Sequence, residues 1–167
     1  MPEGPECRRI AEDLAKYLTH KKIEKIEVLS GRYEKKSITG YQDFVDSLPL
    51  KIAGVGVHGK FIYWILEKQF SIWNTLGMTG SWSFEKGKHS RLKIEVDGVS
   101  VYFNDQRNFG TVKIVRGKEF LIDKLKSLGP DMLYEDVEDE VFGTSKLSSY
   151  CCEIMRFVSF EKWCRHS

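Results

Sequence analysis

The residues with the clearest chemical potential stand at the start of the chain, which reads Met-Pro-Glu-Gly-Pro-Glu. Methionine before a small residue such as proline is usually removed, and its removal would leave Pro2 with a free secondary amine. Such an amine attacks carbonyl-type carbon atoms and forms an iminium, by the covalent chemistry of a Schiff-base lysine. The reference pKa of an α-amino group is about 7.7–8.0, so a useful neutral fraction exists at physiological pH. The alternative interpretation is an ordinary chain start, with acids before a helix.

Two carboxylates accompany this amine. Glu3 is its direct neighbour and can donate and accept protons, and Glu6 lies one helical turn further along as a supporting acid. Together the amine and the two carboxylates predict a nucleophile with its proton carriers.

A lysine in a glycine turn is the next candidate. The segment His58-Gly59-Lys60-Phe61 lies between two apolar runs, and its glycine lets the backbone turn tightly or approach a ligand closely. From such a turn, Lys60 can point into a cleft and bind phosphate. The alternative is a surface lysine at a hairpin.

Two further glycine-containing segments carry apolar side chains, and the second of them also carries a cation. Leu76-Gly77-Met78-Thr79-Gly80 describes a tight loop whose thioether can wedge into a base stack, unless Met78 fills the core instead. Asn104-Asp105-Gln106-Arg107-Asn108-Phe109-Gly110 places a guanidinium near an aromatic ring on a turn, suited to an orphaned base or phosphate and to stacking. The alternative is that Phe109 is a core residue of a strand and Arg107 a solvated charge.

The overall charge does not by itself indicate a nucleic-acid-binding protein, because 26 basic and 24 acidic residues give a net charge of +2. Any such argument must rest on local clusters. Lys88-His89-Ser90-Arg91 is one cluster suited to phosphates, and a solvated loop is the alternative interpretation.

The elements that must position these residues follow from apolar periodicity. Apolar residues at Cys7, Ile10, Ala11, Leu14 and Leu18 predict a helix over residues 5–19. Further helices are predicted at 41–48 and 119–125. Short runs of aromatic and β-branched residues predict strands at 23–28, 51–57, 61–66, 70–74, 81–84, 91–96, 99–104 and 110–115. Short strands with tight turns favour a sandwich or a barrel.

The composition, 41% apolar and 13% aromatic, is typical of a globular domain. No segment approaches the roughly 18 apolar residues of a membrane span, and the acidic, proline-containing start is not a secretion signal. We therefore expect a cytoplasmic or nuclear monomer with reduced cysteines and no membrane partner. Cys151, Cys152 and Cys164 lack the spacing of a zinc ribbon, so no metal site is expected.

The order of the motifs points to a family. Pro-Glu-Gly-Pro-Glu, Gly-Lys, Leu-Gly-Met-Thr-Gly, Lys-His, Asp-x-Arg-x-Phe-Gly and Leu-Gly-Pro-Asp follow one another along residues 2–133. In this order they resemble the catalytic N-terminal domain of the formamidopyrimidine-DNA glycosylase / endonuclease VIII family. The resemblance implies an α+β, mainly β fold, an antiparallel β-sandwich flanked by an N-terminal helix and a second short helix. It also implies base-excision repair of damaged double-stranded DNA, with base flipping, removal of oxidised bases and AP-lyase cleavage.

The resemblance also implies a role for each motif. Pro2 would be the nucleophile at the deoxyribose C1′, Glu3 would shuttle protons during ring opening, and Lys60 would hold the phosphate near the lesion. The gap left by the flipped base would be filled by Met78, Arg107 and Phe109, and DNA would be contacted by His89 and Arg107. The chain departs from the family at His58 and at Asn108, where basic residues are more frequent.

The larger departure lies at the end of the chain. We expect a catalytic domain at 2–133 and an atypical tail at 134–167, because the tail matches neither the helix–two-turn–helix module nor the zinc finger of full-length relatives. No cofactor is expected in this chain, since zinc would belong to the missing finger. Three hypotheses follow: a truncated glycosylase/lyase, a damaged-DNA-binding module without turnover, and an inactive remnant.

Overall fold

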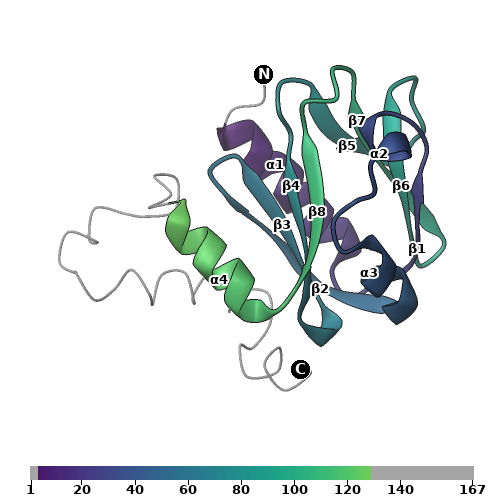
Figure 1. Ribbon diagram of the computed structural model, residues 1–167. Coiled ribbons are helices and arrows are strands. Elements are labelled where there is room, and N and C mark those ends of the chain that lie inside the picture. The colour runs from purple at the N-terminus through teal and green to yellow at the C-terminus, as the bar shows by residue number, and fades with distance from the viewer. Residues whose placement is uncertain (1–3, 129–167) are drawn as a thin grey trace.

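Eight strands form one antiparallel sheet that folds over into two facing layers (Figure 1). The computed structural model describes residues 4–128 of the chain. The strands lie in the order β5-β7-β6-β1-β2-β3-β4-β8. They are β1 (Lys22–Val28), β2 (Leu50–His58), β3 (Phe61–Leu66), β4 (Phe70–Thr75), β5 (Gly80–Ser83), β6 (Ser90–Val96), β7 (Val99–Asp105) and β8 (Thr111–Arg116). The helices are α1 (Gly4–Leu18), α2 (Arg32–Lys35), α3 (Tyr41–Ser47) and α4 (Lys118–Ser127), with a 3-10 turn η1 (Glu67–Gln69).

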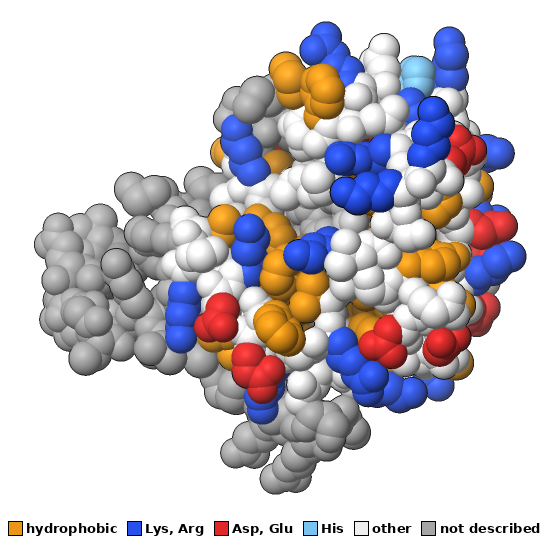
Figure 2. Space-filling view, viewed as in Figure 1, with side chains coloured by type: hydrophobic (Ala, Val, Ile, Leu, Met, Phe, Trp, Pro, Cys, Tyr) orange, Lys and Arg blue, Asp and Glu red, His pale blue; other side chains and the backbone are white. Residues whose placement is uncertain are grey.

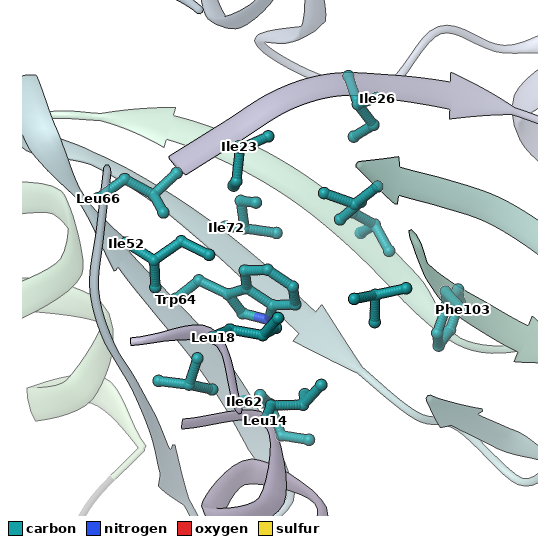
Figure 3. Close-up of a cluster of buried hydrophobic side chains, with 14 of the residues drawn as sticks. Leu14, Leu18, Ile23, Ile26, Ile52, Ile62, Trp64, Leu66, Ile72 and Phe103 are labelled. Atoms are coloured by element: carbon teal, nitrogen blue, oxygen red, sulfur yellow. The ribbon is translucent and has the colours of Figure 1, made fainter. Parts of the chain in front are cut away.

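The sheet folds at the junction of β1 and β2, where the pairing is confined to Lys22 with Lys51 and Ile23 with Leu50. The core lies between the layers. Trp64 of β3 is fully buried, and its ring centroid lies 5.2 Å from that of Trp82 on β5. Figure 3 shows Ile23, Ile72, Trp64 and Phe103 within this one cluster of buried side chains. The antiparallel β-sandwich is thus confirmed.

The flanking helices complete the burial of the sheet. Helix α1 buries the stripe predicted from periodicity, although Ile10 is only partly buried. Strand β3 is buried along its whole length, because its outer side chains Phe61, Tyr63 and Ile65 pack on α4. None of the helices within residues 4–128 is long and apolar enough to cross a membrane.

Each predicted strand agrees with the observed one to within one residue at either end. The single turn α2 was not predicted. It buries none of its residues and is too short to show a periodicity, so its sequence carries no helical signal. The expected domain boundary near residue 133 lies outside the described residues and stays a prediction.

Candidate nucleic-acid interface

The strand register brings three predicted motifs to one edge of the sheet. His58 pairs with Phe61, Phe61 with Thr75, and Thr75 with Thr111. The Gly59-Lys60 turn, the β4–β5 loop (residues 76–79) and the β7–β8 loop (residues 106–110) therefore leave the sheet along one row. Figure 1 shows the tips of the β4–β5 and β7–β8 loops at the top of the molecule.

The beginning of α1 reaches the same edge. The helix packs along β2, and its C-terminal end is tied to that strand because the N–H of His20 donates to the carbonyl of Ile52 at 2.8 Å. From Leu18 back to Gly4 the helix rises roughly 21 Å, and from Ile52 to His58 the strand rises roughly 20 Å. The first turn of α1, with exposed Glu6, thus lies level with the Lys60 turn. Pro2 and Glu3 precede this turn and lie outside the described residues.

His89 joins this edge from the other layer. The N–H of Asp105, the last residue of β7, donates to the carbonyl of His89 at 3.0 Å. His89 is half-buried and its neighbour Lys88 is exposed. The Lys88-His89-Ser90-Arg91 cluster therefore lies directly beside the β7–β8 loop, and its DNA contact stays a prediction.

The β4–β5 and β7–β8 loops touch each other. The Thr79 hydroxyl donates to Asp105 Oδ1 at 2.5 Å, and the Arg107 N–H donates to Thr79 Oγ1 at 3.0 Å. The Gly110 N–H donates to Asp105 Oδ2 at 2.7 Å. Neither Thr79 nor Asp105 had a role assigned from the sequence, although both stand inside quoted motifs. The sequence offered one signal for each role. Thr79 is a polar residue between two glycines, and Asp105 is an aspartate at the end of an apolar strand.

Side chains at the tips of these loops are exposed. Met78 is 42% exposed and Phe109 is 58% exposed, so the alternative that either fills the core is wrong. Arg107, two residues before Phe109 on the same loop, is exposed as well. Figure 2 shows hydrophobic, Lys, Arg and His side chains gathered over the upper edge of the molecule. Two exposed apolar side chains beside a guanidinium can enter a base stack while the cation meets a phosphate or a base.

The Arg91 guanidinium bonds to the protein itself at the start of the β7–β8 loop, and the phosphate contact suggested by its cluster stays a prediction. Its guanidinium donates from Nε to the carbonyl of Asp105 at 2.9 Å, from Nη1 to Ser30 Oγ at 3.0 Å and from Nη2 to the carbonyl of Gln106 at 3.3 Å. With all three nitrogens engaged, Arg91 holds the backbone that enters the β7–β8 loop.

Helix α2 supports the far end of the same loop. Arg32 Nη1 donates to the carbonyl of Gly110 at 3.2 Å. The Tyr33 hydroxyl donates to the carbonyl of Val112 at 3.0 Å and accepts the N–H of Val112 at 2.7 Å. Neither support was predicted from the sequence, because their partners are about eighty positions away along the chain.

The exposed cations and apolar side chains of this edge are suited to an anionic, base-bearing ligand. Within residues 4–128, no group of three or more His, Cys, Asp or Glu side chains could hold a metal ion. Lys60 is exposed at its turn, which is compatible with both the predicted phosphate contact and an ordinary hairpin lysine.

Comparison with known proteins is consistent with this geometry. Residues 1–112 match the profile of the family described as formamidopyrimidine-DNA glycosylase N-terminal domain. The chain is 31% identical over 144 residues to the formamidopyrimidine-DNA glycosylase of Desulfitobacterium hafniense, covering 81% of this chain and 51% of that protein. The chain thus spans about half the length of the curated relatives it matches.

Solved structures share the fold. A complex of the LlFpg protein, a THF-DNA and an inhibitor superposes with a TM-score of 0.65 and 25% identity, over 75% of this chain and 48% of that chain. The Lactococcus lactis formamidopyrimidine-DNA glycosylase bound to DNA containing an AP site gives a TM-score of 0.64 at 24% identity, over 74% and 49% of the two chains.

Proposed function

The chain belongs to the formamidopyrimidine-DNA glycosylase family through its N-terminal domain, and from this premise we propose that it acts in base-excision repair of damaged double-stranded DNA. The proposed activity is that of a glycosylase with AP-lyase activity, acting on oxidised bases. The described residues supply the face that meets the lesion.

One observation carries this proposal. Two loops that are hydrogen-bonded to each other expose Met78, Arg107 and Phe109 at one edge of the sheet. The first turn of α1 is directed toward the same edge. A base extruded for chemistry leaves a gap in the stack, and exposed apolar and guanidinium groups compensate for the stacking that is lost. These three side chains are called the wedge. The wedge and the N-terminal segment would thus meet the same nucleotide from two sides.

The proposed chemistry starts at the Pro2 nitrogen. Its lone pair forms a bond to C1′ of the deoxyribose, and the bond between C1′ and the base breaks as the base leaves with the electron pair and takes up a proton. The proline nitrogen gives up its own proton and so regains a lone pair. The bond between C1′ and O4′ then breaks to give an iminium, and Glu3 protonates O4′. Loss of a proton from C2′ expels the 3′ phosphate, which cleaves the backbone. Lys60 supports these steps by holding a phosphate near the lesion.

Covalent trapping tests the proposal. Borohydride reduces an iminium to a stable amine, so incubating the chain with an abasic-site duplex and borohydride is expected to yield a protein–DNA adduct. Undamaged duplex of the same sequence is the control. Absence of the adduct at every salt concentration would contradict the proposed lyase chemistry.

A damaged-DNA-binding module without turnover is the second candidate, and the wedge favours it because wedge insertion does not require Pro2. Binding titrations separate the two functions. Selective binding to the abasic duplex without any adduct would support the binding module, whereas equal and negligible binding to damaged and undamaged duplexes would point to the inactive remnant.

Replacing Phe109 with alanine is expected to weaken binding to the abasic duplex. Stacking of a base on an aromatic ring is worth about 1–3 kcal/mol, which corresponds to a loss of roughly 5- to 150-fold in affinity. The matched control is Phe120→Ala on α4, since Phe120 is 57% exposed against 58% for Phe109. Fluorescence anisotropy with labelled duplex measures both variants. Equal losses for the two would argue against a wedge at Phe109.

Replacing Lys60 with alanine is expected to weaken binding to damaged and undamaged duplexes alike. In a plot of log affinity against log salt concentration, each phosphate contact adds about 0.9 to the steepness of the negative slope. The steepness for Lys60→Ala should therefore be lower than that of the parent chain by about 0.9. Lys68 is the control, because it is exposed in η1 at the opposite end of β3. An unchanged slope in Lys60→Ala would identify Lys60 as an ordinary hairpin lysine.

A further inference from the structure

We propose that Thr79 and Asp105 are positioning residues that lock the β4–β5 and β7–β8 loops into one preassembled wedge. This inference rests on the proposed function, and it assigns a role to two residues that do not themselves touch DNA. Met78, Arg107 and Phe109 are the side chains that the lock holds in place.

The carboxylate of Asp105 is the centre of the lock. Asp105 is only 1% exposed, and a carboxylate removed from water requires hydrogen-bond donors. One oxygen accepts the Thr79 hydroxyl of the β4–β5 loop, and the other accepts the Gly110 N–H of the β7–β8 loop. Moving either loop away would therefore leave a buried carboxylate oxygen without its donor.

Thr79 transmits this constraint to Arg107. Because its hydroxyl proton is directed to Asp105, the lone pairs of Thr79 Oγ1 are available as acceptors. One of them accepts the Arg107 N–H at 3.0 Å. The backbone of Arg107 is thereby attached to Thr79, the residue that follows Met78. The side chains of the two loops therefore keep fixed positions relative to each other.

The backbone of Asp105 is held as firmly as its side chain. Its N–H donates to the carbonyl of His89 at 3.0 Å, and its carbonyl accepts Arg91 Nε at 2.9 Å. Each polar atom of Asp105 thus has a partner, which fixes the chain where the β7–β8 loop begins. Networks in which all members are satisfied specify one geometry.

Preassembly matters because loops that become ordered only on binding reduce affinity by their lost entropy. A wedge that is already assembled enters the gap without this cost. The lock should therefore matter where a base stack must be entered, and it should not matter on a single strand, which has no stack to fill.

The test compares Thr79→Val, which keeps the shape and removes the hydroxyl, with Thr79→Ser, which keeps the hydroxyl. Thr75→Val is the matched control, because the Thr75 hydroxyl contacts Thr111 within the β4–β8 ladder without joining the two loops. Borohydride trapping is measured on a duplex and on a single strand carrying the same abasic site. A 2-aminopurine placed opposite the abasic site in a second duplex reports entry of the wedge through its fluorescence.

Thr79→Val is expected to lose about tenfold in trapping on the duplex and to keep wild-type trapping on the single strand. It should also lose the 2-aminopurine signal, and Thr79→Ser should restore both readouts. Equal losses on duplex and single strand, or no difference from Thr75→Val, would overturn the positioning role. If the wild-type chain binds the duplex without trapping, the lyase chemistry fails and the 2-aminopurine signal decides the positioning role. If it neither binds nor traps, the positioning role falls with the proposed function.

Discussion

Placing one glycine before Pro2 is expected to abolish the borohydride-trapped adduct with an abasic-site duplex. The proline nitrogen then becomes an amide, whose lone pair is delocalised into the carbonyl group and no longer attacks carbon. The terminal amine of the added glycine lies one residue, about 3.8 Å of chain, beyond the position of the Pro2 nitrogen and is therefore out of place for C1′. Removing the nucleophile of a covalent mechanism lowers turnover by several orders of magnitude, so the adduct should fall below detection. Denaturing gel electrophoresis of the trapped reaction measures it.

The control for this experiment is Pro2→Gly, which retains an amine at the start of the processed chain and should retain part of the adduct. Binding of the extended chain to a duplex with a reduced, unreactive abasic site should equal that of the parent chain. Mass spectrometry of the parent must show that the initiator methionine has been removed. An adduct formed by a chain that still carries this methionine would contradict the role of Pro2.

Gly77→Ala is expected to disrupt the wedge and to destabilise the domain. Gly77 has a φ of 60°, and a Cβ added there would lie 2.7 Å from the carbonyl carbon of Phe109 and 2.8 Å from the nitrogen of Gly110. These are backbone atoms, so the two loops would have to separate. We expect a loss of about 2–3 kcal/mol in the free energy of unfolding, from the unfavourable φ and the clash together. Selectivity for the abasic duplex should fall roughly 10- to 100-fold.

Gly98→Ala is the matched control for Gly77→Ala. Gly98 has a φ of 81° in the β6–β7 hairpin, and no described atom lies within 4 Å of the position of its added Cβ. It therefore carries the conformational cost without the clash. Urea unfolding and duplex binding of both variants isolate the contribution of the loop contact. Identical behaviour of the two variants would show that the loops do not depend on their close approach at Gly77.

Local patterns were sufficient to predict the eight strands and the helices α1, α3 and α4. The strand β6 alternates between buried and half-buried residues, and Asp97-Gly98 separates it from β7, so both the strand and its turn follow from adjacent residues. The helix α1 was equally predictable, because its buried residues recur at the helical period. Such features depend on neighbours in sequence and need no knowledge of the tertiary structure.

Contacts between distant segments were not predictable in this way. Apolar residues in glycine loops are compatible with both the core and the surface, and only the packing placed Met78 and Phe109 outside. A basic residue within a basic cluster is compatible with a phosphate contact, yet Arg91 bonds to carbonyls of the β7–β8 loop. Both outcomes depend on residues brought together by the sheet.

The sequence by itself determined the elements, the order of the motifs and the family they resemble, because hydrophobic periodicity and motif order can be read along one chain. Only the tertiary structure decided that Lys60, His89 and the two wedge loops share one edge with the start of α1. It also revealed the buried carboxylate of Asp105 between those loops. The physical reason is that strand register and burial arise from long-range pairing, which no local pattern specifies.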